Sequence, residues 1–235
     1  MYRLGEKNDF QVERAPFSKP VGVFWTAERQ KQEAKRIFDL QEQPAFAYVE
    51  HMNFMNFRPF HHPQPIYINL VRDPVERVIS WFYYKRTPWN SVKMFEITGK
   101  FQNRSHYFSV LCRFNVSIDR VILSRPFNTP AAIAKAKQNV ERDYSVVGSW
   151  EDVNVTLTVL EHYIPRFFKG VTDLYYEPEV GLAFKKMNTN HWKPKISERI
   201  KRIMRANFTQ EYDFYHFVKQ RLYRQYFAIK KDMEL

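Results

Sequence analysis

The stretch Pro65-Ile-Tyr-Ile-Asn-Leu-Val-Arg-Asp-Pro-Val-Glu-Arg-Val-Ile-Ser80 decides the fold of this chain. Its first half, residues 66–71, is mostly β-branched and apolar, which is typical of a strand buried on both faces of a parallel sheet. Asp73, Pro74 and Glu76 follow at the N-cap, first and third positions of a helix, which is a capping box with an N-terminal proline. The stretch therefore predicts a strand, a tight turn and a helix, the repeating unit of an open α/β sheet.

The rest of the chain continues this pattern. Thr26, Thr129 and Ser197 are predicted helix caps, and Ser149 with Asp152 imitates another capping box after a Gly-Ser turn. The predicted helices are 27–40, 74–86, 130–144, 150–164, 198–208 and a last one from about 210, and the predicted strands are 10–12, 46–49, 66–71 and 144–147. The last helix is expected to face inward through Phe214, Phe217, Val218 and Leu222. We expect residues 185–196, which are polar and basic without periodicity, to form a loop.

Length and charge narrow the class of protein. The 235 residues suit a single domain over 1–235. Lys and Arg outnumber Asp and Glu by 37 to 25, and the resulting charge of +12 favours an anionic partner: a nucleic acid, an acidic membrane or an acidic glycan. A single cysteine, Cys112, excludes an internal disulfide framework and a cysteine-rich zinc site. No stretch approaches the roughly 20 apolar residues of a membrane span, and the start lacks the apolar core of a signal peptide.

Four Asn-x-Ser/Thr sequons nevertheless point toward the secretory pathway. Each one alone is a weak indication, because a sequon is common by chance. Together they favour a lumenal or secreted protein whose targeting element stands upstream of this chain. The candidate glycosylation sites are Asn103, Asn115, Asn154 and Asn207.

Arg72 is the leading candidate for a binding residue. It stands at the carboxyl end of the predicted strand 66–71, directly before a helix, and ligands of open α/β sheets bind at this end of the strands. The unpaired N–H groups of a helix start and the fork of an arginine suit a phosphate, to which Ser80, two turns on, can add a hydroxyl. The alternative is that Arg72 pairs with Asp73 or Glu76 and only closes the turn. The pattern leaves both interpretations open.

Two further candidates are His51 and Lys193. His51 follows the predicted strand 46–49 and can act as a general base near neutral pH, although a structural role is more common for a lone histidine. Lys193 lies in the basic loop 185–196, which can hold phosphate or sulfate groups or can simply be solvated. No metal-binding spacing is present, so no metal is expected. No motif for nucleic-acid binding is present either.

The run over 65–81 resembles the heparan sulfate and uronyl 2-O-sulfotransferases. The resemblance includes the preceding stretch His51-Met-Asn-Phe-Met-Asn-Phe and the later stretches Tyr144-Ser-Val-Val-Gly-Ser-Trp-Glu-Asp and Pro165-Arg-Phe-Phe-Lys-Gly. Within that family it is similar to the insect Pipe branch, and the resemblance covers most of the chain. It implies the parallel-sheet, P-loop-kinase-like sulfotransferase fold, in the Golgi-lumenal domain of a type II membrane enzyme. The implied donor is 3′-phosphoadenosine 5′-phosphosulfate (PAPS), which leaves as adenosine 3′,5′-bisphosphate (PAP). The implied acceptor is the 2-hydroxyl of a uronic acid in an acidic glycan, and a homotrimer is implied as well.

The resemblance also implies roles for individual residues. Arg72 and Ser80 take the positions that bind the 3′-phosphate of the donor. Ser149 takes a donor-contacting position at the second strand-to-helix turn, and Lys193 lies in the basic loop that covers the donor. His51 takes the position of the catalytic base. Sulfuryl transfer then needs no metal, since an imidazole accepts the proton of the hydroxyl and cationic groups stabilise the leaving phosphate.

Three departures from the family pattern bear on activity. The chain starts after the family's phosphosulfate-binding loop, so we expect a fold truncated before that loop and a membrane attachment only through an upstream anchor. Val49 stands where some members carry a second histidine, and the family's cysteine pairs are reduced to Cys112. The alternatives are a catalytically silent isoform or glycan-binding module of the same fold and, from another class, a nucleic-acid-binding protein.

Overall fold

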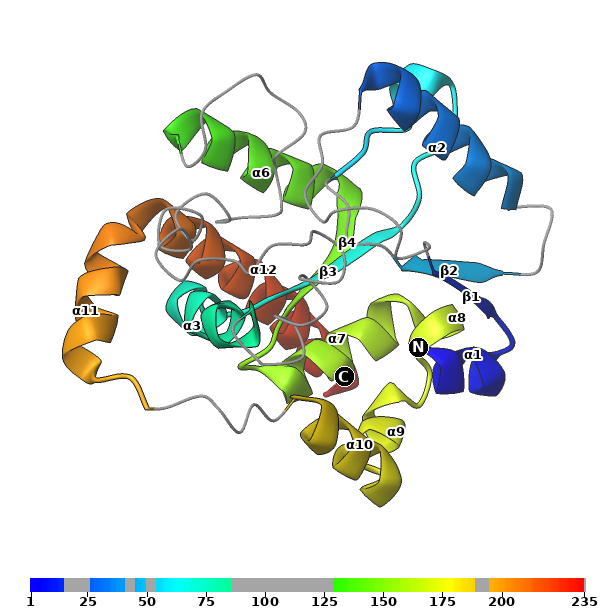
Figure 1. Ribbon diagram of the computed structural model, residues 1–235. Helices are drawn as coiled ribbons and strands as arrows, with labels where there is room; N and C mark the ends of the chain where they lie inside the picture. Colours follow the sequence, from blue (N-terminus) through cyan, green and yellow to red (C-terminus); the bar gives the residue numbers. More distant parts are fainter. Residues whose placement is uncertain (15–25, 41–44, 50–53, 86–128, 189–194, 235) are drawn as a thin grey trace, which may run out of the picture.

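The structure is a computed structural model, and it describes residues 1–14, 26–40, 45–49, 54–85, 129–188 and 195–234. Helices and short strands alternate along the chain, as expected (Figure 1). The elements are α1 (Tyr2–Asn8), β1 (Gln11–Arg14), α2 (Ala27–Asp39), β2 (Phe46–Val49), the 3₁₀ helix η2 (Arg58–Phe60), β3 (Tyr67–Val71), α3 (Pro74–Lys85), α6 (Pro130–Asp143), β4 (Tyr144–Ser149), α7 (Val153–Tyr163), α8 (Pro165–Phe168), α9 (Val171–Tyr176), α10 (Pro178–Asn188), α11 (Glu198–Asn207) and α12 (Thr209–Met233). Among these helices, none is both long and apolar enough to cross a membrane.

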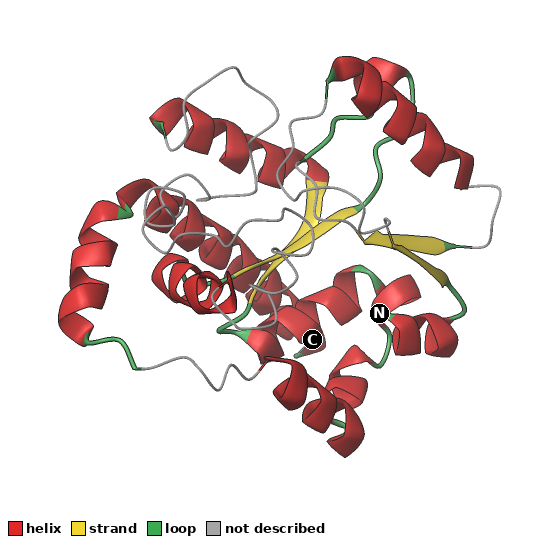
Figure 2. Cartoon of the chain, in the orientation of Figure 1, coloured by secondary structure: helices red, strands yellow, loops and turns green. Residues whose placement is uncertain are grey.

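The strands pair in parallel, which confirms the predicted α/β class. β1 pairs with β2, and β3 pairs with β4, and helices surround the two pairs (Figure 2). In the second pair the register runs from Tyr67 opposite Tyr144 to Val71 opposite Ser149. The carboxyl ends of β3 and β4 therefore meet at one edge of the sheet, and the turns that follow them are neighbours.

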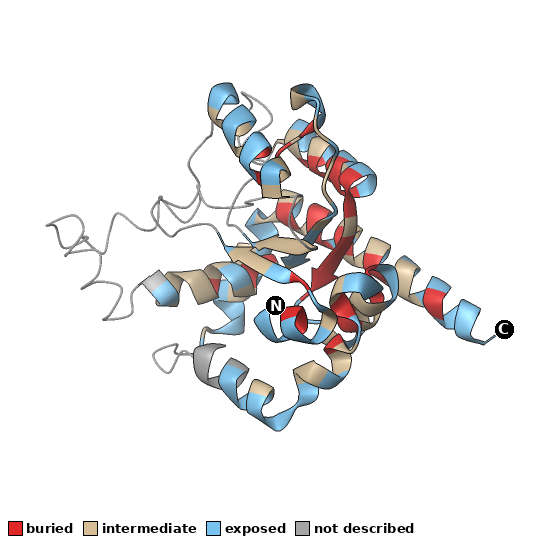
Figure 3. Ribbon diagram, turned by 90° about the vertical axis from the view of Figure 1, so that its right-hand side faces the viewer, coloured by how far each residue is buried: buried red, intermediate tan, exposed pale blue. Residues whose placement is uncertain are grey.

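β4 is the buried strand of the pair. All of its residues except Ser145 are buried, and α6, α7 and α12 all contact it (Figure 3). A side chain at Gly148 would collide with Thr156 Cγ2 and lie 3.1 Å from Leu70 Cδ1, so this glycine lets α7 pack directly on the strand.

β3 differs from its prediction. Burial on both faces was expected, but Ile68 is 40% and Leu70 48% exposed. The reason is that, within the described part of the chain, β3 pairs on one side only, while the covering helices pack mainly on β4. An apolar run by itself does not indicate which strand of a pair lies in the centre.

The predicted caps are confirmed by side-chain hydrogen bonds. The hydroxyl of Thr26 accepts from Arg29 N at 3.3 Å, and that of Thr129 accepts from Ala132 N at 3.2 Å. Ser197 likewise caps α11. These helix starts were predictable because a cap involves residues only three positions apart.

Several predicted boundaries are wrong. The strands β1 and β4 each end two residues later than predicted, at Arg14 and Ser149. α10 continues to Asn188, into the stretch expected to be a loop from residue 185, because the good helix formers after Pro178 extend it. α7 begins at Val153 rather than at residue 150, and its N-cap is Asp152. The last helix agrees with the prediction: Phe214, Val218 and Leu222 are buried.

Candidate functional site

The candidate site is the pair of strand-to-helix turns at the carboxyl ends of β3 and β4. The first turn, residues 72–73, leads into α3, and the second turn, residues 150–152, leads into α7. Trp150 N donates to Val71 O at 2.8 Å, and Asp73 N donates to Glu151 Oε1 at 3.0 Å. The two turns are therefore joined to each other by hydrogen bonds.

The first turn contains the predicted N-cap. Asp73 Oδ1 accepts a hydrogen bond from Glu76 N at 2.9 Å, and Pro74 occupies the first helical position. The predicted capping box is only half formed. Glu76 does not return to Asp73 N but pairs with Lys201 Nζ at 2.7 Å, while Asp73 N donates to Glu151. Glu151, from the second turn, thus takes the place of Glu76 as the acceptor for the Asp73 amide.

The Arg72 side chain has one buried polar atom that lacks a hydrogen-bond partner among the described residues. Its side chain is half-buried, and its Nε is buried without a hydrogen-bond partner in the described part of the chain. Neither Asp73 nor Glu76 forms an ion pair with it among the described residues. A buried donor without a partner is costly, and an anion at this position would satisfy it. The observation favours the binding interpretation of Arg72 over the turn-closing one.

Ser149, the predicted donor contact in the second turn, is fully buried. Its Oγ donates to Asp152 Oδ2 at 2.7 Å and lies 3.2 Å from Glu151 Oε2. Thr156 Oγ1 accepts from Ser149 N at 2.9 Å and donates to Ser149 O at 3.0 Å. Ser149 is therefore the last residue of β4 and holds the second turn, rather than capping α7.

The remaining predicted residues are spread over the chain. Ser80 is half-buried on α3, seven residues beyond the cap and hence about 10 Å along the helix on the same side as Asp73. Asn154 and Asn207 are both exposed; Asn154 Oδ1 accepts from the Tyr176 hydroxyl, and Asn207 Nδ2 donates to Ile203 O at 2.7 Å. The predicted residues that lie outside the described residues are His51, Lys193, Asn103 and Asn115.

The sequence did not indicate that α12 takes part in the site. Tyr212 donates its hydroxyl to Asp73 Oδ2 at 2.8 Å, and Tyr215 donates to Glu151 Oε2 at 2.9 Å. Further along, Tyr223 donates to Asp152 Oδ1 at 2.7 Å, and Lys219 Nζ lies 2.8 Å from Asp152 Oδ2. The signal that could have revealed these residues is their spacing of three and four positions, which places them on one helix face.

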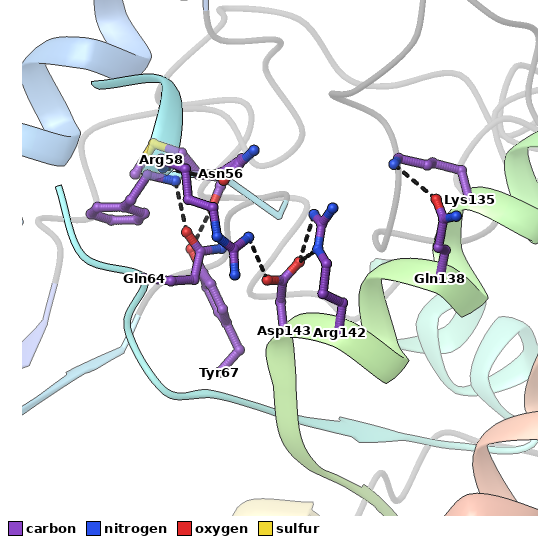
Figure 4. Close-up of polar contacts among 10 residues, drawn as sticks. Asn56, Arg58, Gln64, Tyr67, Lys135, Gln138, Arg142 and Asp143 are labelled. Atoms are coloured by element: carbon purple, nitrogen blue, oxygen red, sulfur yellow. Dashed lines mark hydrogen bonds and ion pairs between the residues drawn. The ribbon is translucent and has the colours of Figure 1, made fainter. Parts of the chain in front are cut away.

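A second polar cluster lies at the opposite, amino end of β3 and β4 (Figure 4). Asp143, whose side chain is 0% exposed, lies 2.7 Å from Arg58 Nη1 and 2.9 Å from Arg142 Nη2. Beside it, the Tyr67 hydroxyl donates to Met55 O at 2.6 Å. Burial, followed by the nearby Tyr144 and Asp143, raises the pKa of Tyr67. At this end of the sheet, the arginines are occupied by a carboxylate.

Comparison with known proteins shows where the chain belongs. No protein-family model matches it. The "Uronyl 2-sulfotransferase homolog pip" of Drosophila melanogaster is 37% identical over 265 residues, which cover 97% of this chain and 50% of that protein. Over almost its whole length the chain is therefore similar to the uronyl and heparan sulfate 2-O-sulfotransferases. The predicted resemblance to this family and to its Pipe branch is thereby confirmed.

Two vertebrate relatives show the same similarity. The "Uronyl 2-sulfotransferase" of Homo sapiens is 28% identical over 97% of this chain and 59% of its own length. The "Heparan sulfate 2-O-sulfotransferase 1" of Gallus gallus is 26% identical over 100% of this chain and 69% of its own length. The chain thus spans about half the length of its Drosophila relative. Among its described residues, no group of three or more His, Cys, Asp and Glu side chains could hold a metal ion.

Proposed function

We propose that the chain carries the nucleotide-binding part of a carbohydrate O-sulfotransferase, which transfers a sulfuryl group from PAPS to the 2-hydroxyl of a uronic acid in an acidic glycan. The observation that carries the proposal is the buried Nε of Arg72 at the carboxyl end of β3, which has no hydrogen-bond partner among the described residues. Two further facts support it: the similarity to 2-O-sulfotransferases, and the parallel pairing that places two strand-to-helix turns side by side. The strands would then belong to the parallel-sheet sulfotransferase fold.

The first turn of α3 determines how a phosphate would be held. Pro74 has no N–H group, and Glu76 N is already bonded to the Asp73 side chain. The helix start therefore offers few free N–H groups, although its partial positive charge remains. Recognition of the 3′-phosphate depends mainly on the guanidinium of Arg72, whose planar fork matches a phosphate group. Ser80 supplies a hydroxyl from α3.

In the proposed reaction, the acceptor oxygen attacks the sulfur of PAPS and the bond between that sulfur and the 5′-phosphate oxygen breaks. The proton of the attacking hydroxyl moves to His51, and the electron pair of the broken bond leaves with PAP. Cationic groups stabilise the charge that develops on the leaving phosphate, and Arg72 and Lys193 are proposed for this part of the site. Ser149 is proposed as the donor contact from the second turn; because it is buried and its hydroxyl donates to Asp152, that hydroxyl would have to exchange Asp152 for the donor. The reaction uses no metal.

The proposal also covers the acceptor, the cellular compartment, the membrane attachment and the assembly of the enzyme. The net charge of +12 is complementary to an acidic glycan. The exposed Asn154 and Asn207 side chains, each in a sequon, fit a Golgi-lumenal domain that carries N-linked glycans. Attachment to the membrane through an upstream segment and assembly into a homotrimer are further predictions from the family.

Calorimetric titration with PAP tests the proposed site. We expect the wild-type chain to bind and Arg72→Ala to lower affinity about 100-fold, because a charged hydrogen-bonding group is removed. Arg142→Ala, which removes a half-exposed arginine at the other end of the same sheet, is the matched control and should change affinity by less than about twofold. Absence of wild-type binding, or equal losses in the two variants, would refute the proposal.

A transfer assay with labelled PAPS and desulfated heparan sulfate then separates two functions that share this fold. Incorporation of label that is lost in His51→Ala supports the enzyme with His51 as its base. Retention of the glycan without incorporation of label would instead indicate a glycan-binding module. Persistent turnover in His51→Ala would show that another group accepts the proton.

A further inference from the structure

The proposed phosphate site has carboxylates as its immediate neighbours. Asp73 directly follows Arg72, and Glu151 and Asp152 form the adjacent second turn. Free carboxylates at these positions would repel a phosphate, and that of Asp73 would also be available to pair with Arg72. A site for a polyanionic nucleotide therefore requires that these charges are held by other groups.

Each oxygen of the three carboxylates has a donor within the described structure. Asp73 Oδ1 accepts from Glu76 N and Oδ2 accepts from Tyr212. Glu151 Oε1 accepts from Asp73 N, and its Oε2 accepts from Tyr215. Asp152 completes the set, with Tyr223 on one oxygen and Lys219 and Ser149 on the other.

One face of α12 supplies most of these donors. Tyr212, Tyr215, Lys219 and Tyr223 recur every three or four positions, and α12 contacts α3, β4 and α7, the elements that flank both turns (Figure 1). Burial and then the Asp73 carboxylate raise the pKa of Tyr212 to about 12. Burial and then Glu151 raise the pKa of Tyr215. Both phenols are therefore neutral donors at physiological pH.

A neutral donor has an advantage beside an anion site. A phenol satisfies a carboxylate oxygen without adding a charge of its own, and the Arg205 guanidinium in turn bonds Tyr212. Tyr212 also occupies the Asp73 oxygen that does not accept from Glu76 N, so that both oxygens have donors other than Arg72. This arrangement agrees with the absence of an Arg72–Asp73 ion pair among the described residues.

We propose that Tyr212 and Tyr215 are positioning residues for nucleotide binding: they hold the Asp73 and Glu151 carboxylates toward α12, so that Arg72 faces the phosphate without a competing anion. This inference rests on the proposed function of the same site. α12, which follows both turns in the sequence, then contributes to the affinity for the donor as well as to the hydrophobic core.

A double-mutant cycle read out by PAP titration tests the inference. Tyr212→Phe should weaken PAP binding about tenfold, because the freed Asp73 carboxylate pairs with Arg72. Asp73→Asn keeps a good N-cap and removes the charge. In that background the additional Tyr212→Phe change should weaken binding by less than about threefold. A purely structural role for Tyr212 would not produce this rescue.

Tyr226→Phe is the matched control on the same helix, because its hydroxyl has no hydrogen bond in the described part of the chain. It should change PAP affinity by less than about twofold. The inference is overturned if Tyr212→Phe binds as tightly as Tyr226→Phe, or if the loss is equally large in the Asp73→Asn background. Absence of binding by the wild-type chain, in contrast, would refute the proposed function and remove the inference with it.

Hydrogen exchange provides a second measurement that needs no nucleotide. The amide of Asp73 donates to the Glu151 carboxylate, which Tyr215 holds, and the amide of Glu76 donates to the Asp73 carboxylate, which Tyr212 holds. Their exchange should be faster in Tyr212→Phe and Tyr215→Phe than in Tyr226→Phe, while the amides of β4 keep their protection. Unchanged exchange at Asp73 and Glu76 would overturn the inference, and general loss of protection would identify a variant that does not fold.

Discussion

The two ends of the β3–β4 pair contain the same kinds of side chain in opposite combinations. At the amino end, the buried Asp143 carboxylate is held by Arg58 and Arg142. At the carboxyl end, Asp73 is held by a phenol and a backbone N–H, and the Nε of the neighbouring Arg72 has no hydrogen-bond partner among the described residues. The number of charges at an end is therefore a poor guide to binding. What matters is whether the acid beside an arginine is satisfied by arginine or by other donors; Asp152 at the carboxyl end is paired with Lys219.

The difference between the two ends of the sheet also separates residues that affect the stability of the fold from residues that affect nucleotide affinity. A cluster in which cations and an acid satisfy each other stabilises the fold and leaves little for a ligand. A cluster in which the acids are satisfied by neutral groups leaves a cation available at the cost of some stability. We expect substitutions at the amino end to change the free energy of unfolding and those at the carboxyl end to change nucleotide affinity.

The largest effect on stability is expected from Asp143→Ala. It leaves Arg58 and Arg142 adjacent without their common partner and should lower the free energy of unfolding by about 3 kcal/mol, measured by urea denaturation. PAP affinity should stay within about twofold of wild type. A variant that keeps its stability but loses nucleotide binding would reverse the comparison between the two ends.

A smaller loss is expected from Gly148→Ala, which affects the carboxyl end through packing. The new methyl group collides with the buried Thr156, and the strain should lower the free energy of unfolding by about 2 kcal/mol. Because Thr156 also bonds Ser149, nucleotide affinity should fall together with stability. Gly181→Ala, where no atom lies within 4 Å of the added Cβ, is the control and should not destabilise the chain.

The smallest effect is expected in alkaline solution. The pKa of Tyr212 is raised from 10.0 to about 12 in the folded chain, so the unfolded chain releases this proton first as the pH rises. The contribution of Tyr212 is fully present below pH 10 and is lost between pH 10 and about 12. Since Tyr212 is partly exposed, the loss should be about 1 kcal/mol or less. The decline measured over this range should be shallower in Tyr212→Phe than in Tyr226→Phe, and equal slopes would contradict the assigned contact.

Local features of the site were predictable from the sequence. The strand ending before Arg72, the Asp73 cap and the first helical position of Pro74 all depend on residues within a few positions of one another, and the structure has them as expected. The same holds for the parallel arrangement, since strands separated by helices pair in this way.

Features that depend on distant residues were not predictable. The exposure of Ile68 and Leu70 depends on which strand of the pair the helices cover. The late start of α7 reflects the use of Glu151 by Asp73, which lies 78 residues away. The bond from Tyr212 to Asp73 spans 139 residues, and no local pattern specifies it. The assignments of Ser80, His51 and Lys193 stay predictions.

The contacts of α12 also determine the order in which the parts of the site can assemble during translation. The bonds from Tyr212, Tyr215 and Tyr223 to the two turns join residues 139, 64 and 71 positions apart, and in each the tyrosine is the later partner. During translation both turns emerge from the ribosome well before the helix that restrains them, because a chain is synthesised from its N-terminus. On the proposed function, a nascent chain in which β3 and β4 have paired would therefore bind the nucleotide more weakly, and full affinity would be acquired only when α12 docks.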